Sequence, residues 1–264
     1  MTASASTLRH PRARTGGASA WALAAWNEAA GRVLYRYRNT LFPTVILVVV
    51  LFVRPRILFG HPAIDLALTV IGTLVALTGE VVRLVTIGYD YIDRGGRNKQ
   101  AYASRLVVGG VFAHVRNPMY LGNLLIAIGV GMIVGAPIMY LVVIPFFLFV
   151  YQAIVASEEA YLRPRFGRDY DRYCSLVPRF IPALRGIRRT FAGMPYQWKR
   201  ALRQDLSTIT ALLLGLACLP LWRLYFLHGF NAAKAAAPAT ALQALGAVSF
   251  FVVVLALKKS KRLG

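Results

Sequence analysis

Long apolar runs alternate with short polar segments along most of this 264-residue chain. A helix that crosses a bilayer needs about 20 consecutive apolar residues, within a range of roughly 17–25. Four of the runs meet that length by themselves, whereas the first and the third are shorter. The pattern predicts an all-α, polytopic transmembrane helical protein with about six spans. The apolar runs are Leu41–Val53, Ala63–Ile87, Met119–Val134, Ile138–Ala156, Ser207–Leu227 and Ala239–Leu257.

The third run, Met119–Val134, is separated from the fourth by only Gly135-Ala136-Pro137. Gly and Pro favour a tight turn, so we expect the two runs to form a helical hairpin whose short arm packs tightly. Gly129 and Gly131 lie inside the short arm, without the preceding strand that a phosphate-binding loop needs. Close packing of helices through small residues is therefore the favoured interpretation of these glycines.

The basic residues indicate how the spans are oriented. If the N-terminus is cytoplasmic, the cytoplasmic segments are 1–39, 88–118, 157–206 and 258–264, and they hold 26 of the 31 Lys and Arg residues. An excess of Lys and Arg on the cytoplasmic side is the usual rule for membrane proteins. We therefore expect a multi-pass integral membrane protein with both termini in the cytoplasm, in a bacterial inner membrane.

The amino-acid composition indicates which kinds of binding partner suit this chain. With 57% hydrophobic and 16% charged residues, the chain is too apolar for a single water-soluble domain. The formal net charge of +21 suits nucleic acid or anionic lipid. Because the basic residues are spread along membrane-flanking loops, we expect a lipid bilayer partner and no nucleic acid. Two cysteines and four scattered histidines favour neither a disulfide framework nor a metal site.

The polar stretch Ser104–Gly122 ends where the third apolar run begins, at Asn117-Pro118. Asn is a good N-cap and Pro is preferred at the first helical position, so this pair predicts a helix start. The free N–H groups of a helix start also suit a carboxylate or a phosphate, and Arg116 adds a cation. A simple helix start and an anion-binding helix start both remain open.

Two adjacent carboxylates follow the fourth apolar run. Glu159 has Arg163 four residues later, so an ion pair is its expected role. Glu158 has no such partner at helical spacing, and an ionisable group at membrane depth is functional by default. Within the second run, Glu80 has Arg83 three residues on; we expect an internal ion pair, with a ligand contact as the alternative.

Three motifs in order carry a family resemblance. R-N-P-M-Y-x-G precedes the hairpin, and E-E-x-x-L-x-x-x-F-G-x-x-Y-x-x-Y and V-P-R-x-x-P follow it. Together they resemble the isoprenylcysteine carboxyl methyltransferase and phospholipid methyltransferase superfamily, over about residues 70–182. The resemblance implies an integral membrane methyltransferase with a catalytic region at the cytoplasmic face. It also implies S-adenosylmethionine as cofactor and a membrane-embedded amphiphile as substrate.

The resemblance assigns roles residue by residue. It implies catalytic roles for Arg116 and Glu158, and His114 is a candidate base for an amine acceptor. In two places the chain departs from the family: Asn117 replaces a histidine, and Ile154 replaces an arginine that reads the substrate carboxylate in prenylcysteine enzymes. The implied cofactor-binding residues are Ser104, Arg105, Leu106, Val107, Phe112, Asn117, Pro118, Met119, Tyr120 and Glu158.

The expected organisation has five parts. A disordered basic tail and an interfacial helix at Trp21–Tyr37 occupy 1–38, and the first two spans occupy 39–88. The methyltransferase-like region with its hairpin is 89–182, a basic interfacial segment is 183–206, and two further spans with a basic tail are 207–264. The last two spans lie outside the resemblance.

Two other functions remain open at this stage. One is a membrane reductase of the sterol type that uses NADPH, and the other is a non-catalytic membrane scaffold with the same fold. For a methyltransferase, the acceptor remains open between an isoprenylcysteine carboxylate, a phospholipid amine and another amphiphile. The sequence does not determine the oligomeric state.

Overall fold

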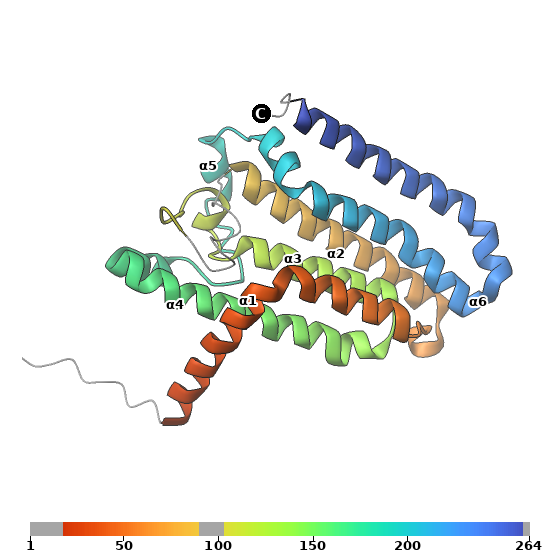
Figure 1. Ribbon diagram of the computed structural model, residues 1–264, viewed down its shortest axis with the longest axis horizontal. Helices are drawn as coiled ribbons and strands as arrows, with labels where there is room; N and C mark the ends of the chain where they lie inside the picture. Colours follow the sequence, from red (N-terminus) through yellow and green to blue (C-terminus); the bar gives the residue numbers. More distant parts are fainter. Residues whose placement is uncertain (1–17, 90–102, 261–264) are drawn as a thin grey trace, which may run out of the picture.

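The computed structural model describes residues 18–89 and 103–260, and within them the regular structure is helical, without a β-strand (Figure 1). The predicted all-α class is confirmed. Most of the predicted disordered tail falls on residues 1–17, outside the described residues. The α-helices are α1 (Ala18–Phe52), α2 (Pro62–Tyr89), α3 (Pro118–Val134), α4 (Ile144–Leu176), α5 (Ile187–Ala192) and α6 (Trp198–Lys259). Short 3-10 turns cover Leu58–Gly60 and Gly110–Ala113, and a π-helical turn covers Met139–Val143.

Three of the helical stretches are long and apolar enough to cross a membrane: α2, Met139–Leu176 and α6. α3 is also apolar but has only 17 residues. α6 contains the last two predicted spans, and Gly229 divides it with a φ of 84°, a conformation that favours glycine. The chain reverses there (Figure 1), so that Leu206 and Val254 share one buried cluster. The exact number of spans stays a prediction.

The interfacial helix expected at Trp21–Tyr37 is continuous with the first predicted span, and both belong to α1. α1 changes direction along its length (Figure 1) and packs chiefly against α4. Gly31 lies so close to the carbonyl of Ala153 that no side chain larger than hydrogen fits between the two backbones. Tyr35, one turn later, is buried against Ile154. Part of the expected interfacial helix therefore packs on protein.

α2 and α3 pack antiparallel through two pairs of glycines. Gly72 faces the carbonyl of Gly129, and Gly79 faces the carbonyl of Gly122. A Cβ at Gly79 would lie 2.5 Å from the Gly122 oxygen, well inside van der Waals contact. Small residues at such positions let helix backbones approach closely in a membrane. The close packing predicted for Gly129 is confirmed, although the short arm of the hairpin packs mainly on α2 and less on α4.

Buried ion pairs join α2 to α6 near both ends of the bundle. Arg83 donates to Asp205 through Nε at 3.0 Å and again through Nη2, and both side chains are almost fully buried. Glu80 lies 3.7 Å from Arg83, which confirms the expected internal pair. Towards the other end, Arg223 pairs with Asp65. Charges removed from water need such partners, because an unpaired buried charge costs several kcal/mol.

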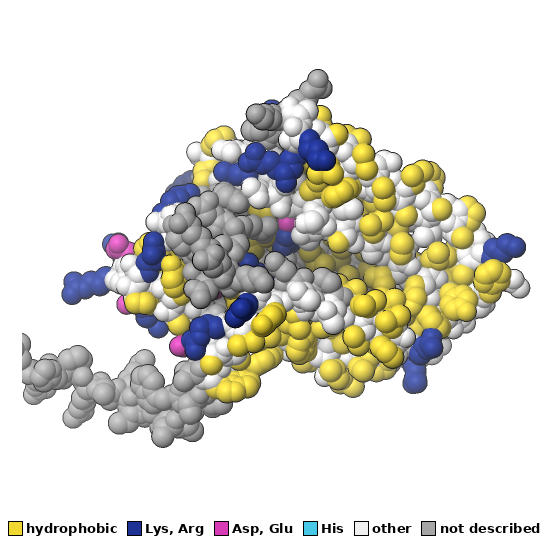
Figure 2. Space-filling view, viewed as in Figure 1, with side chains coloured by type: hydrophobic (Ala, Val, Ile, Leu, Met, Phe, Trp, Pro, Cys, Tyr) yellow, Lys and Arg dark blue, Asp and Glu magenta, His cyan; other side chains and the backbone are white. Residues whose placement is uncertain are grey.

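The basic segment expected at the membrane surface, 183–206, packs on the C-terminal end of α2. Arg200 donates to the carbonyls of Ile87 (2.9 Å) and Gly88 (3.0 Å), a favourable place for a cation because a helix C-terminus carries partial negative charge. Leu184 is 67% exposed and the neighbouring arginines Arg185 and Arg188 are exposed as well. Figure 2 shows Lys and Arg side chains gathered mostly around this end of the molecule and hydrophobic side chains along the helix flanks.

The glycine interface predicts a directional effect on stability. Gly79→Ala forces α2 away from α3, and overpacking of this kind costs about 1–3 kcal/mol. Gly215→Ala is the matched control, because a Cβ there meets open space and Ala has the higher helix propensity. Thermal unfolding in detergent should show a lower Tm for Gly79→Ala only. Equal Tm values for the two variants would contradict the close approach of α2 and α3.

The buried pair between α2 and α6 predicts a larger effect. Asp205→Ala leaves the guanidinium of Arg83 without its bidentate partner, at a cost of about 3–5 kcal/mol. The control Asp171→Ala removes an ion pair with Arg163. The side chains of Arg163 and Asp171 are 59% and 60% exposed, so the expected cost is about 0–1 kcal/mol. Denaturant unfolding measures both, and a small loss for Asp205→Ala would show that this pair does not hold α6 on α2.

Candidate functional site

Two of the three family motifs lie side by side. The N–H of Arg116 donates to the carbonyl of Pro178 at 2.9 Å, and the N–H of Ala183 donates to the carbonyl of His114 at 2.9 Å. The side-chain amide of Asn117 donates to the carbonyl of Arg179 at 3.1 Å. The start of α3 is thus fastened to the segment after α4. Pro118 occupies the first turn of α3 as predicted, while the Asn117 side chain makes this tertiary bond and no cap bond.

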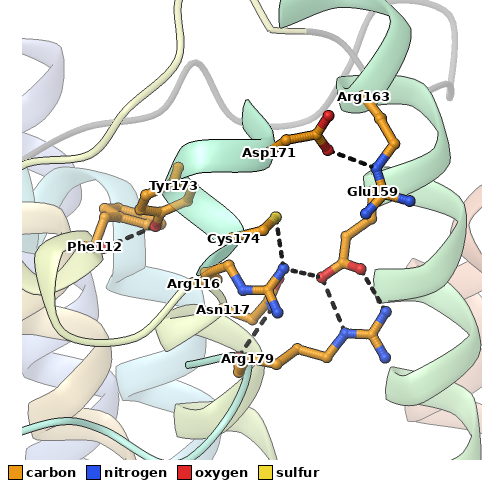
Figure 3. A network of polar contacts seen from close by, with 9 residues as sticks. All are labelled: Phe112, Arg116, Asn117, Glu159, Arg163, Asp171, Tyr173, Cys174 and Arg179. Carbon is orange, nitrogen blue, oxygen red and sulfur yellow. Dashed lines mark hydrogen bonds and ion pairs between the residues drawn. The ribbon is translucent and has the colours of Figure 1, made fainter. Parts of the chain in front are cut away.

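The carboxylate of Glu159 joins the motifs (Figure 3). Arg179 donates to both of its oxygens, through Nε at 2.9 Å and Nη2 at 2.5 Å, and Arg116 donates through Nη1 at 3.0 Å. Bidentate pairs of this kind are among the stronger polar contacts in proteins. The hydrogen bonds to Glu159 are the main reason why the pKa of Arg179 is raised above its ordinary value. Arg116 also contacts the sulfur of Cys174 at 2.8 Å.

The expected ion pair between Glu159 and Arg163 is wrong. Arg163 pairs instead with Asp171 at 3.1 Å on the surface, as Figure 3 also shows. Spacing along one helix identified Arg163 as a neighbour, but two guanidiniums from distant segments reach Glu159 with better geometry. Arg116, expected to serve as a cation for a ligand, is committed to this network.

Glu158 faces a different set of residues from Glu159. The hydroxyl of Tyr120, in the first turn of α3, donates to Oε1 of Glu158 at 2.8 Å. Tyr120 also packs near Tyr151, with ring centroids 5.4 Å apart. Consecutive residues of a helix point in different directions, so one carboxylate fastens the loops while the other faces the interior between α1, α3 and α4. The helix start and the acid after the hairpin converge, as expected.

α1 contributes two residues that sequence reasoning missed, Tyr35 and Arg38. The guanidinium carbon of Arg38 lies 3.8 Å from the centroid of the Tyr35 ring. Arg38 lies near enough to Glu158 for the charge of that carboxylate to act on the guanidinium. α1 lies outside the motif region, and Arg36 and Arg38 look alike in sequence. The only available signal was a cation at the edge of an apolar run.

A glycine break interrupts the second motif, E-E-x-x-L-x-x-x-F-G-x-x-Y-x-x-Y. Gly167, with a φ of 52°, interrupts α4 and changes the direction of the chain. Tyr170 and Tyr173 beyond it pack in one cluster with Val177 and Leu106. The Tyr173 hydroxyl donates to the carbonyl of Phe112 at 2.7 Å. The F-G-x-x-Y-x-x-Y motif thus holds the segment that leads to the start of α3.

The remaining predicted residues lie in the segment that leads into α3 and in its first turn. Val107 and Phe112 are buried, Ser104 and Arg105 are exposed, and Met119 is partly buried.

His114 is buried, with Nδ1 2.6 Å from the Ala183 carbonyl and Nε2 2.9 Å from the Thr190 hydroxyl. Both ring nitrogens of His114 are therefore bound to protein groups. The structure brings Tyr120 to Glu158, and it gathers Leu106 and Phe112 around the tyrosines after Gly167.

Comparisons with known proteins address the same region. Residues 61–169 match the model of the phospholipid methyltransferase family. The chain is 32% identical over 96 residues to the protein-S-isoprenylcysteine O-methyltransferase of Schizosaccharomyces pombe, covering 36% of this chain and 39% of that protein. It is 27% identical over 124 residues to the protein of the same name from Xenopus laevis, covering 46% and 43%. These matches confirm the family resemblance of the motifs.

Another relative is named as a metal-resistance protein rather than as a methyltransferase. The cobalt-zinc-cadmium resistance protein CzcN of Cupriavidus metallidurans is 30% identical over 140 residues, covering 52% of this chain and 62% of that protein. The chain thus spans less than two thirds of the length of each of these three relatives. No solved structure matches the chain.

Neutralising Glu159 should destabilise the protein more than neutralising the adjacent Glu158. Glu159→Gln removes the charge that two guanidiniums share, and hydrogen bonds to charged groups are worth about 1.5–3 kcal/mol each. Glu158→Gln keeps an oxygen acceptor for Tyr120, so we expect a loss of stability under about 1 kcal/mol. Thermal unfolding of the two variants tests this, and a greater loss for Glu158→Gln would reverse the two roles.

Proposed function

We propose that this chain, whose residues 61–169 match the model of the phospholipid methyltransferase family, is an integral membrane methyltransferase that uses S-adenosylmethionine and acts on an amphiphile embedded in the bilayer. The observation that carries the proposal is the contact between Tyr120 and Glu158, which joins the first turn of α3 to α4. The acceptor carries an isoprenylcysteine-type carboxylate or a phospholipid-type amine. The site faces the cytoplasm, at the end of the molecule where the basic side chains gather.

The chemistry of the donor set fits this cofactor. A carboxylate and aromatic rings suit a sulfonium and an ammonium cation, and Glu158 and Tyr120 provide such groups in contact with each other. Among the described residues, Tyr120 donates to Oε1 of Glu158 and no hydrogen bond reaches Oε2. That oxygen has the capacity to accept an N–H from a ligand. The N-terminal turn of α3 supplies positive potential for the carboxylate of the cofactor tail.

When bound, S-adenosylmethionine supplies a methyl carbon that the acceptor's oxygen or nitrogen attacks while the carbon–sulfur bond breaks and the sulfur leaves as a neutral thioether. The residues of the chain orient the reactants and exclude water, which accounts for most of the rate in such a displacement. A carboxylate acceptor needs no base. An amine acceptor must lose a proton, and because His114 has both nitrogens bound, Glu158 is the base available in the described cluster.

Cofactor titration of the purified protein tests the proposal. We expect S-adenosylmethionine to bind the wild type and to bind Glu158→Ala at least about tenfold more weakly, or about 1.4 kcal/mol, because the carboxylate that faces the cation is lost. Asp171→Ala is the matched control, a carboxylate on the same helix whose side chain is 60% exposed. Isothermal titration calorimetry gives the affinities.

Two outcomes would overturn the proposal. One is the absence of cofactor binding by the wild type, or unchanged binding by Glu158→Ala. The other is thermal stabilisation by NADPH without any by S-adenosylmethionine, which would favour a nicotinamide-dependent reductase.

A further inference from the structure

We propose that Arg38 of α1 binds an anionic oxygen group of the acceptor, a carboxylate or a phosphate, beside Glu158. This inference rests on the proposed function and extends it from the cofactor to the acceptor. Arg38 lies outside the residues matched by the family model, and no motif includes it.

Packing fixes the position of Arg38. Gly31 brings α1 against α4, and Tyr35 is buried in one cluster with Val150 and Ile154, against which Tyr120 also packs. Arg38 follows Tyr35 by three residues and therefore lies on the same side of α1. The Tyr35 ring supports the guanidinium at 3.8 Å, a stacking that arginine favours. The cation is thereby held at the edge of the Tyr120–Glu158 contact.

The hydrogen bonding of Arg38 is incomplete. Its Nη1 is buried and, within the described part of the chain, has no hydrogen-bond partner. Arg38 interacts with Glu158 through its charge, yet the described residues contain no ion pair between the two within 4.0 Å. A buried N–H group without an acceptor is costly and uncommon in native proteins. A ligand oxygen is the partner that would satisfy it.

α4 lacks a cation at this level of the site. Ile154, one turn before Glu158, is fully buried and apolar, in the place where the resemblance puts a carboxylate-reading arginine. The structure supplies a guanidinium from α1 instead, the helix whose Tyr35 packs on Ile154. The resulting arrangement pairs Glu158 with the cationic cofactor and Arg38 with the anionic acceptor, so that charges alternate across the site.

Both acceptor classes contain the required group. An isoprenylcysteine carries a carboxylate, and a phospholipid amine carries a phosphate one short linker away from its nitrogen. The planar, multiply donating guanidinium matches either oxyanion. Arg38 also lies at the predicted boundary between cytoplasm and membrane, just before the first two spans at 39–88, where lipid head groups lie.

Acceptor binding, measured without cofactor, tests the inference. The probes are N-acetyl-S-farnesylcysteine, its neutral carboxamide, and phosphatidylethanolamine in neutral detergent micelles, each radiolabelled for equilibrium binding. We expect the wild type to bind at least one of the two probes that carry an anionic oxygen group, the farnesylcysteine acid and the phospholipid, and Arg38→Gln to weaken that binding tenfold or more. Binding of the carboxamide should change less than twofold. A selective loss for the farnesylcysteine acid assigns a carboxylate to Arg38, and a selective loss for the phospholipid assigns a phosphate.

Two controls separate this inference from the proposed function. Arg36→Gln removes an exposed arginine from the same helix and should leave every affinity unchanged. Arg38→Gln should bind S-adenosylmethionine within twofold of the wild type, because Glu158 is intact. If the wild type binds no cofactor, the proposed function fails, while the acceptor measurements still decide the role of Arg38.

Several results would overturn the inference. One is that the wild type binds neither the farnesylcysteine acid nor the phospholipid. Another is that Arg38→Gln binds both of them as tightly as the wild type does. If Arg38→Gln does not fold, Arg38→Lys decides the question, since it keeps the charge and loses the planar donors. An unaltered preference of Arg38→Lys for acid over carboxamide would then count against a guanidinium contact.

Discussion

The candidate site depends on one carboxylate, that of Glu159, which Arg116 and Arg179 share. Arg116 immediately precedes the start of α3, and Arg179 lies in the segment that follows α4. Because both guanidiniums meet the same side chain of α4, three segments far apart in sequence are held in a fixed relation. The backbone bond from Arg116 to Pro178 and the amide bond from Asn117 to Arg179 strengthen the same connection. Together these contacts hold the segment just before α3 close to α4, where Tyr120 reaches Glu158.

A bilayer environment explains why polar contacts contribute strongly to the association of these helices. Within lipid, helices gain little from burying apolar side chains against one another, because the lipid tails are equally apolar. The bundle relies instead on close backbone approach, as at Gly79 and Gly122, and on buried ion pairs, as between Arg83 and Asp205. The exposed apolar side chains of α2 and α6 are left for the surrounding lipid. Rigid packing of this kind positions the ends of the helices, where the candidate site lies.

The adjacent acids Glu158 and Glu159 illustrate how one motif serves two purposes. Glu159 is saturated by guanidiniums, whereas Glu158 receives a single hydrogen bond from Tyr120 among the described residues. A fully paired carboxylate stabilises structure, and an incompletely paired one retains capacity for a ligand. Arg116 is ion-paired with Glu159, whereas the buried Nη1 of Arg38 has no hydrogen-bond partner among the described residues. On the proposed function, the incompletely satisfied pair would face the reactants.

The sequence by itself determined the helical class, the apolar runs, the helix start at Pro118 and the pair of Glu80 with Arg83. These follow from composition, periodicity and local spacing, which act within one helix or one turn. The order of the three motifs carried the resemblance to the methyltransferase superfamily. Only the tertiary structure decided that Glu159 pairs with Arg116 and Arg179 rather than with Arg163, and that Arg38 approaches Glu158. Such contacts depend on how closely helices approach, here through Gly31 against Ala153, and on where a break such as Gly167 redirects the chain. Sequence spacing predicts which residues are neighbours on a single helix. The partner of a buried charge, however, is the group that tertiary packing places within hydrogen-bonding distance.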